Sequence, residues 1–140
     1  HPQNYLCGCP YFQGATKGTE AGDLNTEVDF GYAGEYMEAA HQILQLEHPY
    51  DFILCTGEVH SLKEVLQEAF RLVDLNPEKY VQFDPKLLRP SKTSPLIGDY
   101  RKARQAFGFD PKVRFRELIR LMLDQDLILA EEELRRKQVG

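Results

Sequence analysis

Glu58 and His60 stand two residues apart in the segment Thr56-Gly-Glu-Val-His-Ser61. A carboxylate and an imidazole at this spacing could transfer protons as a general acid–base pair. Such chemistry also needs a reacting group, and no nucleophile or further base accompanies the two residues. Ser61 and Glu64 have the Ser-x-x-Glu spacing of a capping box, in which both side chains satisfy free backbone N–H groups at a helix start. We therefore interpret Glu58 and His60 as residues that shape a turn and a helix entry.

The cysteines Cys7, Cys9 and Cys55 are the other residues that could carry chemistry. Cys7 and Cys9 could offer two thiolates to a metal, but structural zinc takes four ligands and His1 is the only other candidate nearby. The sequence therefore predicts no metal site. An odd number of cysteines in a chain that can bury a core indicates reduced thiols and a cytoplasmic setting.

The composition is typical of one globular domain of 140 residues, 42% of them hydrophobic. The 22 acidic residues outnumber the 17 basic ones and give a formal charge of −5, so we expect no nucleic-acid partner. No apolar run approaches the roughly 18 residues that a membrane span requires, so we expect no membrane partner.

Apolar periodicity predicts the elements that must position any site. Four helices are expected, at residues 36–46, 62–73, 100–107 (after a cap at Asp99 and before Gly108) and 115–137. Two short strands are expected, at 51–56 and 80–83. Pro90 and Pro95, together with the preceding Pro85, predict an extended, ligand-accessible loop at residues 87–97.

The expected fold class is therefore a small mixed α/β domain over residues 23–140. Residues 1–22 show no sustained periodicity, and we expect them to form an irregular lead-in.

Several motifs with unrelated spacings follow one another along the chain: Asp29-Phe-Gly-Tyr-Ala33, Glu35-Tyr-Met-Glu-Ala39, Cys55-Thr-Gly-Glu-Val-His-Ser61, Phe83-Asp-Pro-Lys-Leu-Leu-Arg-Pro90, Gly98-Asp99, Lys102-Ala103 and Phe115-Arg-Glu-Leu-Ile119. In this order they resemble the C-terminal part of the GDP-mannose 4,6-dehydratase family, over about residues 23–130. Residues 1–22 are not covered. The resemblance implies an extended short-chain dehydrogenase/reductase, in which an N-terminal nucleotide-binding domain precedes a substrate-binding part such as this chain.

Enzymes of this family dehydrate a nucleotide sugar with NADP, and need a glycine-rich turn for the cofactor and a Tyr-x-x-x-Lys pair. No tyrosine of this chain is followed four residues later by a lysine. We therefore expect no catalytic residues and no cofactor-binding residues in the chain, although the resemblance implies NADP for the complete enzyme.

The resemblance also implies partners. It predicts a nucleotide sugar, GDP-mannose or a relative, as ligand. It further predicts either a homo-oligomer or association with a missing N-terminal nucleotide-binding half. Exposed apolar faces left open by such a missing half would drive self-association, and we expect a dimer.

Arg89 and Lys92 are the substrate-binding residues that the resemblance implies. The family's Tyr/Phe-Arg-Pro-Thr-Glu segment places an arginine and a glutamate on the nucleotide, and here the arginine is kept at Arg89 while the glutamate becomes Lys92. A guanidinium suits a diphosphate because its donors bind two oxygens at once. A second family arginine corresponds to Val28. On the residues alone, Arg89 could equally pair with a nearby carboxylate.

Three functions are compatible with these observations. The first is the nucleotide-sugar-binding part of a GDP-mannose 4,6-dehydratase-like enzyme, not catalytically complete by itself. The second is a non-catalytic remnant or interaction module. The third is a part of a related nucleotide-sugar epimerase or reductase.

Overall fold

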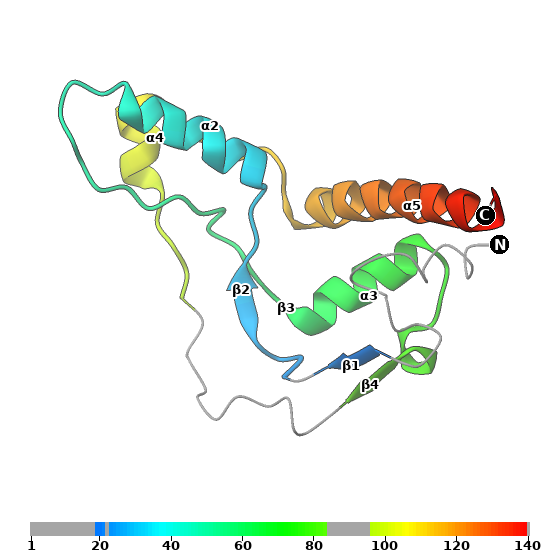
Figure 1. The fold of residues 1–140 in the computed structure, drawn as a ribbon. Helices are drawn as coiled ribbons and strands as arrows, with labels where there is room; N and C mark the ends of the chain where they lie inside the picture. The colour runs from blue at the N-terminus through cyan, green and yellow to red at the C-terminus, as the bar shows by residue number, and fades with distance from the viewer. Residues whose placement is uncertain (1–18, 22, 84–95, 140) are drawn as a thin grey trace.

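A computed structural model describes residues 19–21, 23–83 and 96–139, which form a mixed α/β arrangement (Figure 1). The elements in chain order are β1 (Thr19–Ala21), β2 (Glu27–Asp29), α2 (Ala33–Leu44), β3 (Val59–Ser61), α3 (Leu62–Leu72), the 3₁₀ turn η2 (Pro77–Lys79), β4 (Val81–Phe83), α4 (Arg101–Phe107) and α5 (Phe115–Val139). β1 pairs with β4 in parallel, and β2 pairs with β3 in antiparallel fashion, with Val28 opposite His60. The predicted mixed α/β class and its four helices are confirmed.

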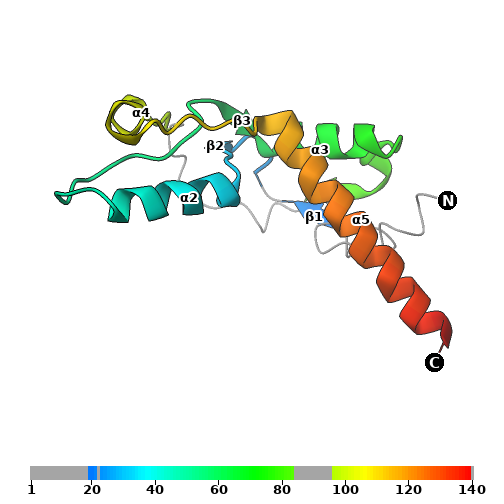
Figure 2. The same cartoon turned by 90° about the horizontal axis from the view of Figure 1, so that it is seen from above.

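The helices form two hydrophobic cores, one toward each end of the described structure (Figures 1 and 2). The α3/α5 core contains the buried residues Ala69, Phe70, Val73, Phe115, Ile119 and Leu123. The α2/α4 core contains the buried residues Ala39, Ala103 and Phe109, with Tyr36, Phe52, Leu54, Tyr100 and Phe107 packed against them. The β2–β3 pair lies between the two cores (Figure 1).

The start of α3 is fixed by the predicted capping box, which the structure confirms. The Glu64 N–H donates to Ser61 Oγ at 3.2 Å, and the Ser61 N–H donates to Glu64 Oε2 at 2.7 Å. The apolar face of α3 then packs on α5, where Phe70 is only 1% exposed. Burying a side chain of this size contributes roughly 1.5–3 kcal/mol, so the α3/α5 contact stabilises both helices.

The longest helix, α5, is buried in its first half and charged in its second. Leu118, Ile119 and Leu123 are buried, whereas the second half runs away from α3 toward the C-terminus (Figure 2). Three ion pairs at i,i+4 spacing line this half: Glu131–Arg135, Glu132–Arg136 and Glu133–Lys137. The helix predicted to end at 137 continues to Val139. Such pairs stabilise a helix by about 0.2–0.5 kcal/mol each.

The strand predicted at 51–56 is not a strand of either sheet. Its apolar residues Phe52 and Leu54 do pack into the α2/α4 core, but this segment makes no backbone ladder with another described segment. The strand predicted at 80–83 is confirmed as β4. Strands β1, β2 and β3, each of three residues, were not predicted.

The bounds of α2 and α4 also differ from the sequence prediction. The helix expected at 36–46 spans Ala33–Leu44, and Leu44 is 80% exposed instead of facing a core. The helix expected from residue 100 begins at Arg101 with Tyr100 as its N-cap residue, while the Asp99 carboxylate still accepts the Arg101 N–H at 3.0 Å. Gly108 ends this helix with a φ of 77°, as expected of a residue without a Cβ.

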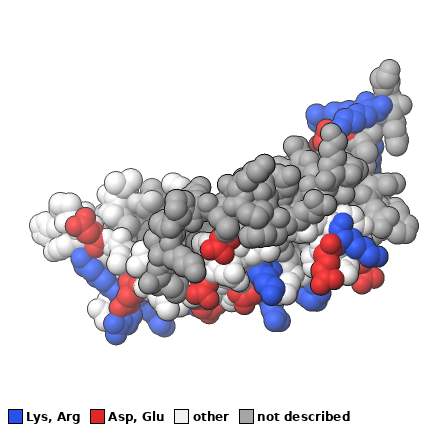
Figure 3. Space-filling view, turned by 90° about the horizontal axis from the view of Figure 1, so that it is seen from below, with Lys and Arg blue, Asp and Glu red and all other residues white. Residues whose placement is uncertain are grey.

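The described surface carries charges of both signs. Lys and Arg side chains are interspersed with Asp and Glu side chains over the face in Figure 3. Among the ion pairs of the described residues is that of Glu68 with Arg71, at 2.7 Å. None of the helices in the described ranges has the length and apolar character to cross a bilayer.

Candidate functional site

Asp29, the last residue of β2, organises the turn that follows the extended segment 51–56. Its Oδ1 accepts the Thr56 backbone N–H at 2.9 Å and the Thr56 hydroxyl at 2.6 Å, and its Oδ2 accepts the Gly57 N–H at 2.8 Å. Gly57 has a φ of 78°, which glycine adopts without steric cost. One carboxylate therefore ties the β2 strand to a turn 27 residues further along the chain.

Arg114, the residue before α5, reaches the same turn. Its Nη1 donates to the Thr56 carbonyl oxygen at 2.9 Å and to Glu58 Oε1 at 3.4 Å. A hydrogen bond with the Tyr100 side chain raises the pKa of the Arg114 guanidinium, and the charge of Glu58 also raises it. Arg114, which directly precedes α5, therefore binds both the turn and Tyr100 at the start of α4.

His60 lies next to the turn and packs flat on Phe115, with ring centroids 3.8 Å apart and planes 15° from parallel. Its Nδ1 is 3.6 Å from a Glu64 oxygen and its Nε2 is 3.9 Å from a Glu58 oxygen. The Nε2 atom is buried and makes no hydrogen bond within the described structure. The structure thus brings Glu58 and His60 together, with the ring packed at the entry of α3. This geometry agrees with a role in shaping the turn.

Two further ionisable groups, Tyr36 and Cys55, are influenced by the charge of Asp29. Burial raises the pKa of Tyr36 to about 12, and the charges of Asp29, Cys55 and Glu35 act in the same direction. Burial also raises the pKa of the free Cys55 thiol, with Asp29 as the next cause. Both groups therefore stay protonated near neutral pH, so neither Tyr36 nor Cys55 is prepared to act as a base or nucleophile.

Carboxylates of the chain's own side chains bind backbone N–H groups at the starts of α3 and α4 and in the segment just before α5. Glu64 binds at α3, Asp99 binds the first N–H of α4, and Glu35 Oε1 accepts the N–H groups of Lys112 at 2.7 Å and Val113 at 3.2 Å just before α5. A dinucleotide pyrophosphate would need such free N–H groups and would be repelled by these carboxylates.

Gly31, just before α2, and Gly34, in its first turn, do not provide space for a phosphate either. A Cβ added to Gly31 would lie 2.0 Å from the Tyr36 hydroxyl, and one added to Gly34 would lie 2.6 Å from the Tyr32 ring. The space beside both glycines is thus filled by tyrosine side chains. The described residues therefore do not fit the pyrophosphate of NADP.

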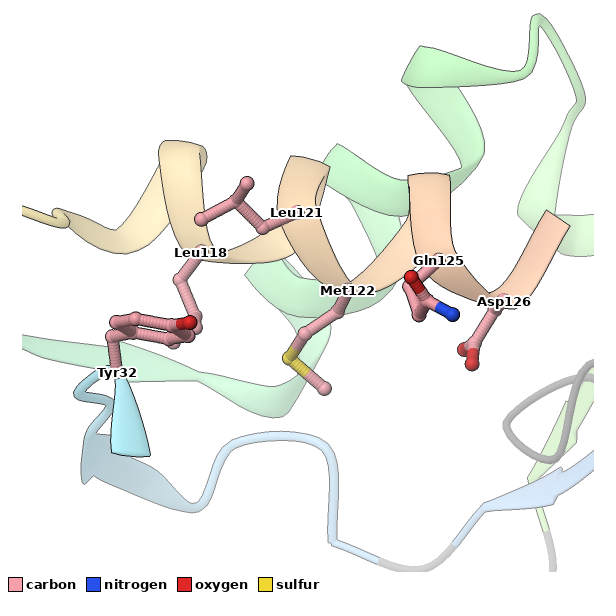
Figure 4. A pocket seen from close by; sticks show the side chains of 6 residues that line it. All are labelled: Tyr32, Leu118, Leu121, Met122, Gln125 and Asp126. Carbon is pink, nitrogen blue, oxygen red and sulfur yellow. The ribbon is translucent and has the colours of Figure 1, made fainter. Parts of the chain in front are cut away.

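A hollow of about 420 Å³ lies between the β2–α2 connection and α5 (Figure 4). Its lining is Tyr32, Leu118, Leu121, Met122, Gln125 and Asp126, with the Tyr32 ring beside Leu118 (Figure 4). The only charge in this lining is negative, and no guanidinium or ammonium group contributes. An anionic diphosphate would gain nothing here, so this hollow is unsuited to the nucleotide end of a nucleotide sugar.

The predicted substrate-binding residues Arg89 and Lys92 lie outside the described residues, as do Cys7 and Cys9. The described residues end at Phe83, after β4, and begin again at Leu96. At Gly98 it passes close to Cys55, because a Cβ added there would lie 2.6 Å from the Cys55 Sγ. Among the described side chains no group of three His, Cys, Asp or Glu residues could hold a metal ion.

Sequence reasoning did not identify Asp29, Thr56 and Arg114 as linked residues. The one local signal was the Thr56-Gly57 pair after an apolar run, because the free N–H groups of such a turn need an acceptor. Nothing in the sequence indicated that the acceptor would be a residue on β2 or that Arg114 would bind the carbonyl.

Residues 11–122 of the chain match the model of the GDP-mannose 4,6 dehydratase family. The matched region begins inside residues 1–22, where the motifs had given no resemblance. The chain is 40% identical over 112 residues to GDP-mannose 4,6 dehydratase 1 of Arabidopsis thaliana, covering 80% of this chain and 31% of the relative. It is 33% identical over 125 residues to the human GDP-mannose 4,6 dehydratase, covering 77% of this chain and 34% of the relative.

Solved structures of similar fold cover most of the chain. RMD from Pseudomonas aeruginosa, complexed with NADPH, superposes with a TM-score of 0.68 at 15% identity, over 90% of this chain and 40% of that chain. The UDP-glucose 4-epimerase of Thermus thermophilus, complexed with NAD, superposes with a TM-score of 0.67 at 26% identity, over 89% of this chain and 38% of that chain. The chain spans about a third of the length of the curated relatives it matches. The family model covers most of this chain, and the chain therefore belongs to the GDP-mannose 4,6-dehydratase family.

Proposed function

We propose that this chain is the nucleotide-sugar-binding portion of a 4,6-dehydratase and that it is not catalytically complete by itself. The observation that carries the proposal is the 112-residue match to a dehydratase at 40% identity. The family match over residues 11–122 spans Asp29, Thr56 and Arg114 around the organised turn. The raised pKa values of Tyr36 and Cys55 keep both groups protonated near neutral pH, so neither is suited to act as a base or nucleophile. Asp29 and Arg114 hold the turn through hydrogen bonds, which supports a role in binding and positioning.

We assign the contact with the diphosphate of the nucleotide sugar to Arg89. Its guanidinium can donate two parallel hydrogen bonds to phosphate oxygens. Lys92, in contrast, can only donate hydrogen bonds, so it cannot accept from ribose hydroxyls as a carboxylate would. Val28 likewise offers no charge. Nucleoside diphosphates should therefore bind weakly and with little preference for guanine.

The proposal for NADP concerns the complete enzyme. One neighbouring structure carries NADPH, but the N-termini of α3 and α4 in this chain bind carboxylates of their own side chains. The cofactor would bind to a nucleotide-binding half outside this chain. The buried free thiol of Cys55 agrees with a reducing, cytosolic setting for the assembly.

Calorimetric titration of the 140-residue chain with GDP and with UDP tests the assignment of Arg89. Arg89→Ala should weaken binding about 10- to 100-fold, equivalent to roughly 1.5–3 kcal/mol for hydrogen bonds to a charged group. Lys86→Ala removes a charge from the same segment and serves as the matched control, with less than a threefold effect expected. Lys92→Glu should raise the preference for GDP over UDP. Equal affinities of the wild type and Arg89→Ala would show that this arginine does not bind the diphosphate.

A related epimerase is the second candidate, because the Thermus UDP-glucose 4-epimerase has a TM-score of 0.67 and 26% identity. The two candidates differ in the base of the nucleotide. A clear preference of the chain for UDP over GDP would favour the epimerase.

A further inference from the structure

Glu35 lies in the first turn of α2, and its carboxylate binds the chain immediately before α5. Its Oε1 accepts the backbone N–H groups of Lys112 at 2.7 Å and of Val113 at 3.2 Å, and its Oε2 lies 3.4 Å from the Val113 nitrogen. These contacts join residues 77 and 78 positions apart in the sequence. Hydrogen bonds to an ionised carboxylate are about twice as strong as neutral ones, so this contact can hold two distant elements together.

The residues bound by Glu35 belong to the connection between the two hydrophobic cores. The connection runs from Gly108, which ends α4, to the start of α5. Phe109 is buried in the α2/α4 core, and Phe115 is buried in the α3/α5 core. In both views α2 and α5 extend from this connection to opposite sides (Figures 1 and 2). The direction of α5 relative to α2 therefore depends on how the connection is held.

This direction matters because one segment of the chain runs from one core to the other. Before it, Val81 of β4 packs against the α3/α5 core. After it, Gly98 lies against Cys55, the end of the stretch whose apolar side chains pack into the α2/α4 core. The segment in between, residues 84–95, contains Arg89 and lies outside the described residues. A change in the direction of α5 would change the separation of the described residues on either side of it.

We propose that Glu35 is a positioning residue for nucleotide-sugar binding. Its carboxylate fixes the direction of α5 relative to α2, and with it the separation of the two described ends between which Arg89 lies. Glu35 acts through the backbone of Lys112 and Val113 and not by contact with the ligand. The part that concerns ligand binding rests on the proposed function, whereas the part that concerns the direction of α5 does not.

The other charged side chains at this junction have different partners. Asp29 and Arg114 bind the turn at Thr56, so removing the Glu35 carboxylate leaves the hydrogen bonds of that turn in place. The Lys112 ammonium pairs with Asp110, and Glu35 binds the Lys112 backbone. Lys112→Ala therefore removes a nearby charge and keeps the N–H that Glu35 binds.

Distances between two spin labels on the full chain test the direction of α5. Cys7→Ser and Cys9→Ser remove two possible labelling sites, and Cys55, which is 5% exposed, stays unlabelled. Gln42→Cys then places one label on the exposed side of α2, and Gln125→Cys places the other on the exposed side of α5.

Glu35→Ala should shift or broaden the distribution of distances between the labels at positions 42 and 125, because the connection loses its acceptor. Glu35→Gln keeps one acceptor oxygen and should have a smaller effect. Two controls should match the wild type: Lys112→Ala, and Glu38→Ala, which removes an exposed carboxylate from the same helix.

A second pair of labels shows whether Glu35→Ala leaves the α3/α5 core intact. Gln67→Cys on α3 and Gln125→Cys on α5 both lie in this half of the molecule, at exposed positions. The distance between these two labels should be the same in the wild type and in Glu35→Ala.

Titration of the same chain with GDP tests the part that concerns ligand binding. Glu35→Ala should weaken GDP binding about threefold to tenfold, the size expected of a residue that acts through the structure. Glu38→Ala should not change the affinity. In an Arg89→Ala background, Glu35→Ala should have less than about a twofold further effect, because the contact that it positions is already lost.

Identical distance distributions for the wild type and Glu35→Ala would overturn the assignment of Glu35. A changed distance between positions 67 and 125 would also overturn it, because Glu35 would then support the fold as a whole. A shifted direction of α5 with unchanged GDP affinity would overturn the role in binding. A wild type that binds neither GDP nor UDP would contradict the proposed function and with it the binding part, while the distances would still decide whether Glu35 fixes the direction of α5.

Discussion

The two cores of this chain differ in how completely the chain covers them. The α3/α5 core is closed: Phe70 and Ile119 are buried, and the start of α3 is capped by its own side chains. Beside the α2/α4 core, residues 52–55 make no backbone–backbone hydrogen bond to another described residue, and Ile53 is 57% exposed. The comparison teaches that local sequence accounts for the start of α3 and its packing on α5, whereas the apolar pattern of residues 51–55 is found without a strand partner among the described residues.

The turn held by Asp29 lies between these two ends. Asp29 contacts Thr56 and Gly57 on one side, while Arg114 connects the same turn to the first residue of α5, Phe115. The closed core therefore provides rigidity to a turn that borders the open one. A binding portion benefits from such an arrangement, because its ligand-facing segments need a fixed base.

The largest effect is expected in the closed core. Phe70→Ala should lower the free energy of unfolding by about 3–5 kcal/mol, because it removes a fully buried ring and leaves a cavity. Leu129→Ala, at a residue that is 48% exposed on α5, should change it by less than about 0.5 kcal/mol. Urea unfolding measures both. Similar values for the two variants would mean that α3 and α5 do not share a closed core.

A smaller effect is expected at the link between the two ends. Asp29→Ala removes the acceptor of three hydrogen bonds and should lower the free energy of unfolding by about 2–3 kcal/mol. Asp29→Asn keeps one acceptor oxygen and should therefore lower the free energy of unfolding by less than Asp29→Ala does. Thermal unfolding of the wild type, Asp29→Asn and Asp29→Ala ranks the three proteins by stability. A wild-type melting temperature for Asp29→Ala would contradict the role assigned to this carboxylate.

The smallest effect concerns the exposed start of α4. Hydrogen bonds from the Arg101 side chain and its backbone N–H lower the pKa of Asp99 to about 2. A carboxyl with a lowered folded-state pKa contributes stability above its ordinary pKa, near 4, and loses it as the pH falls toward 2. Arg101→Gln should therefore raise the Asp99 pKa in an NMR titration, while Arg104→Gln should leave it unchanged. An Asp99 midpoint near 4 in the wild type would contradict the pairing.

The sequence predicted the closed end better than the open end. The Ser61–Glu64 capping box and the apolar stripe of α5 are local patterns, and both are confirmed. The interpretation of residues 51–56 depended on an apolar run alone, which specifies burial but not the strand that would pair with it. Asp29 lies 27 positions from Thr56 in the sequence, and Arg114 lies 58 positions from it. No local sequence pattern predicts a contact between residues so far apart.

The candidate site was predictable only through family resemblance. The motifs identified the family correctly, and they assigned Arg89 and Lys92 to the nucleotide, an assignment that stays a prediction. The structural roles of Thr56 and Arg114 became visible only from their hydrogen bonds, because threonine and arginine occur on any surface.

The most direct measurement uses the Arabidopsis relative as a host. Residues 11–122 of this chain replace the matched third of GDP-mannose 4,6 dehydratase 1, and the hybrid is assayed for loss of water from GDP-mannose. The account predicts turnover by the hybrid, with a tenfold or greater fall on Arg89→Ala and little change on Lys86→Ala. A folded hybrid that neither binds nor converts GDP-mannose would contradict the assignment of this chain as a nucleotide-sugar-binding portion.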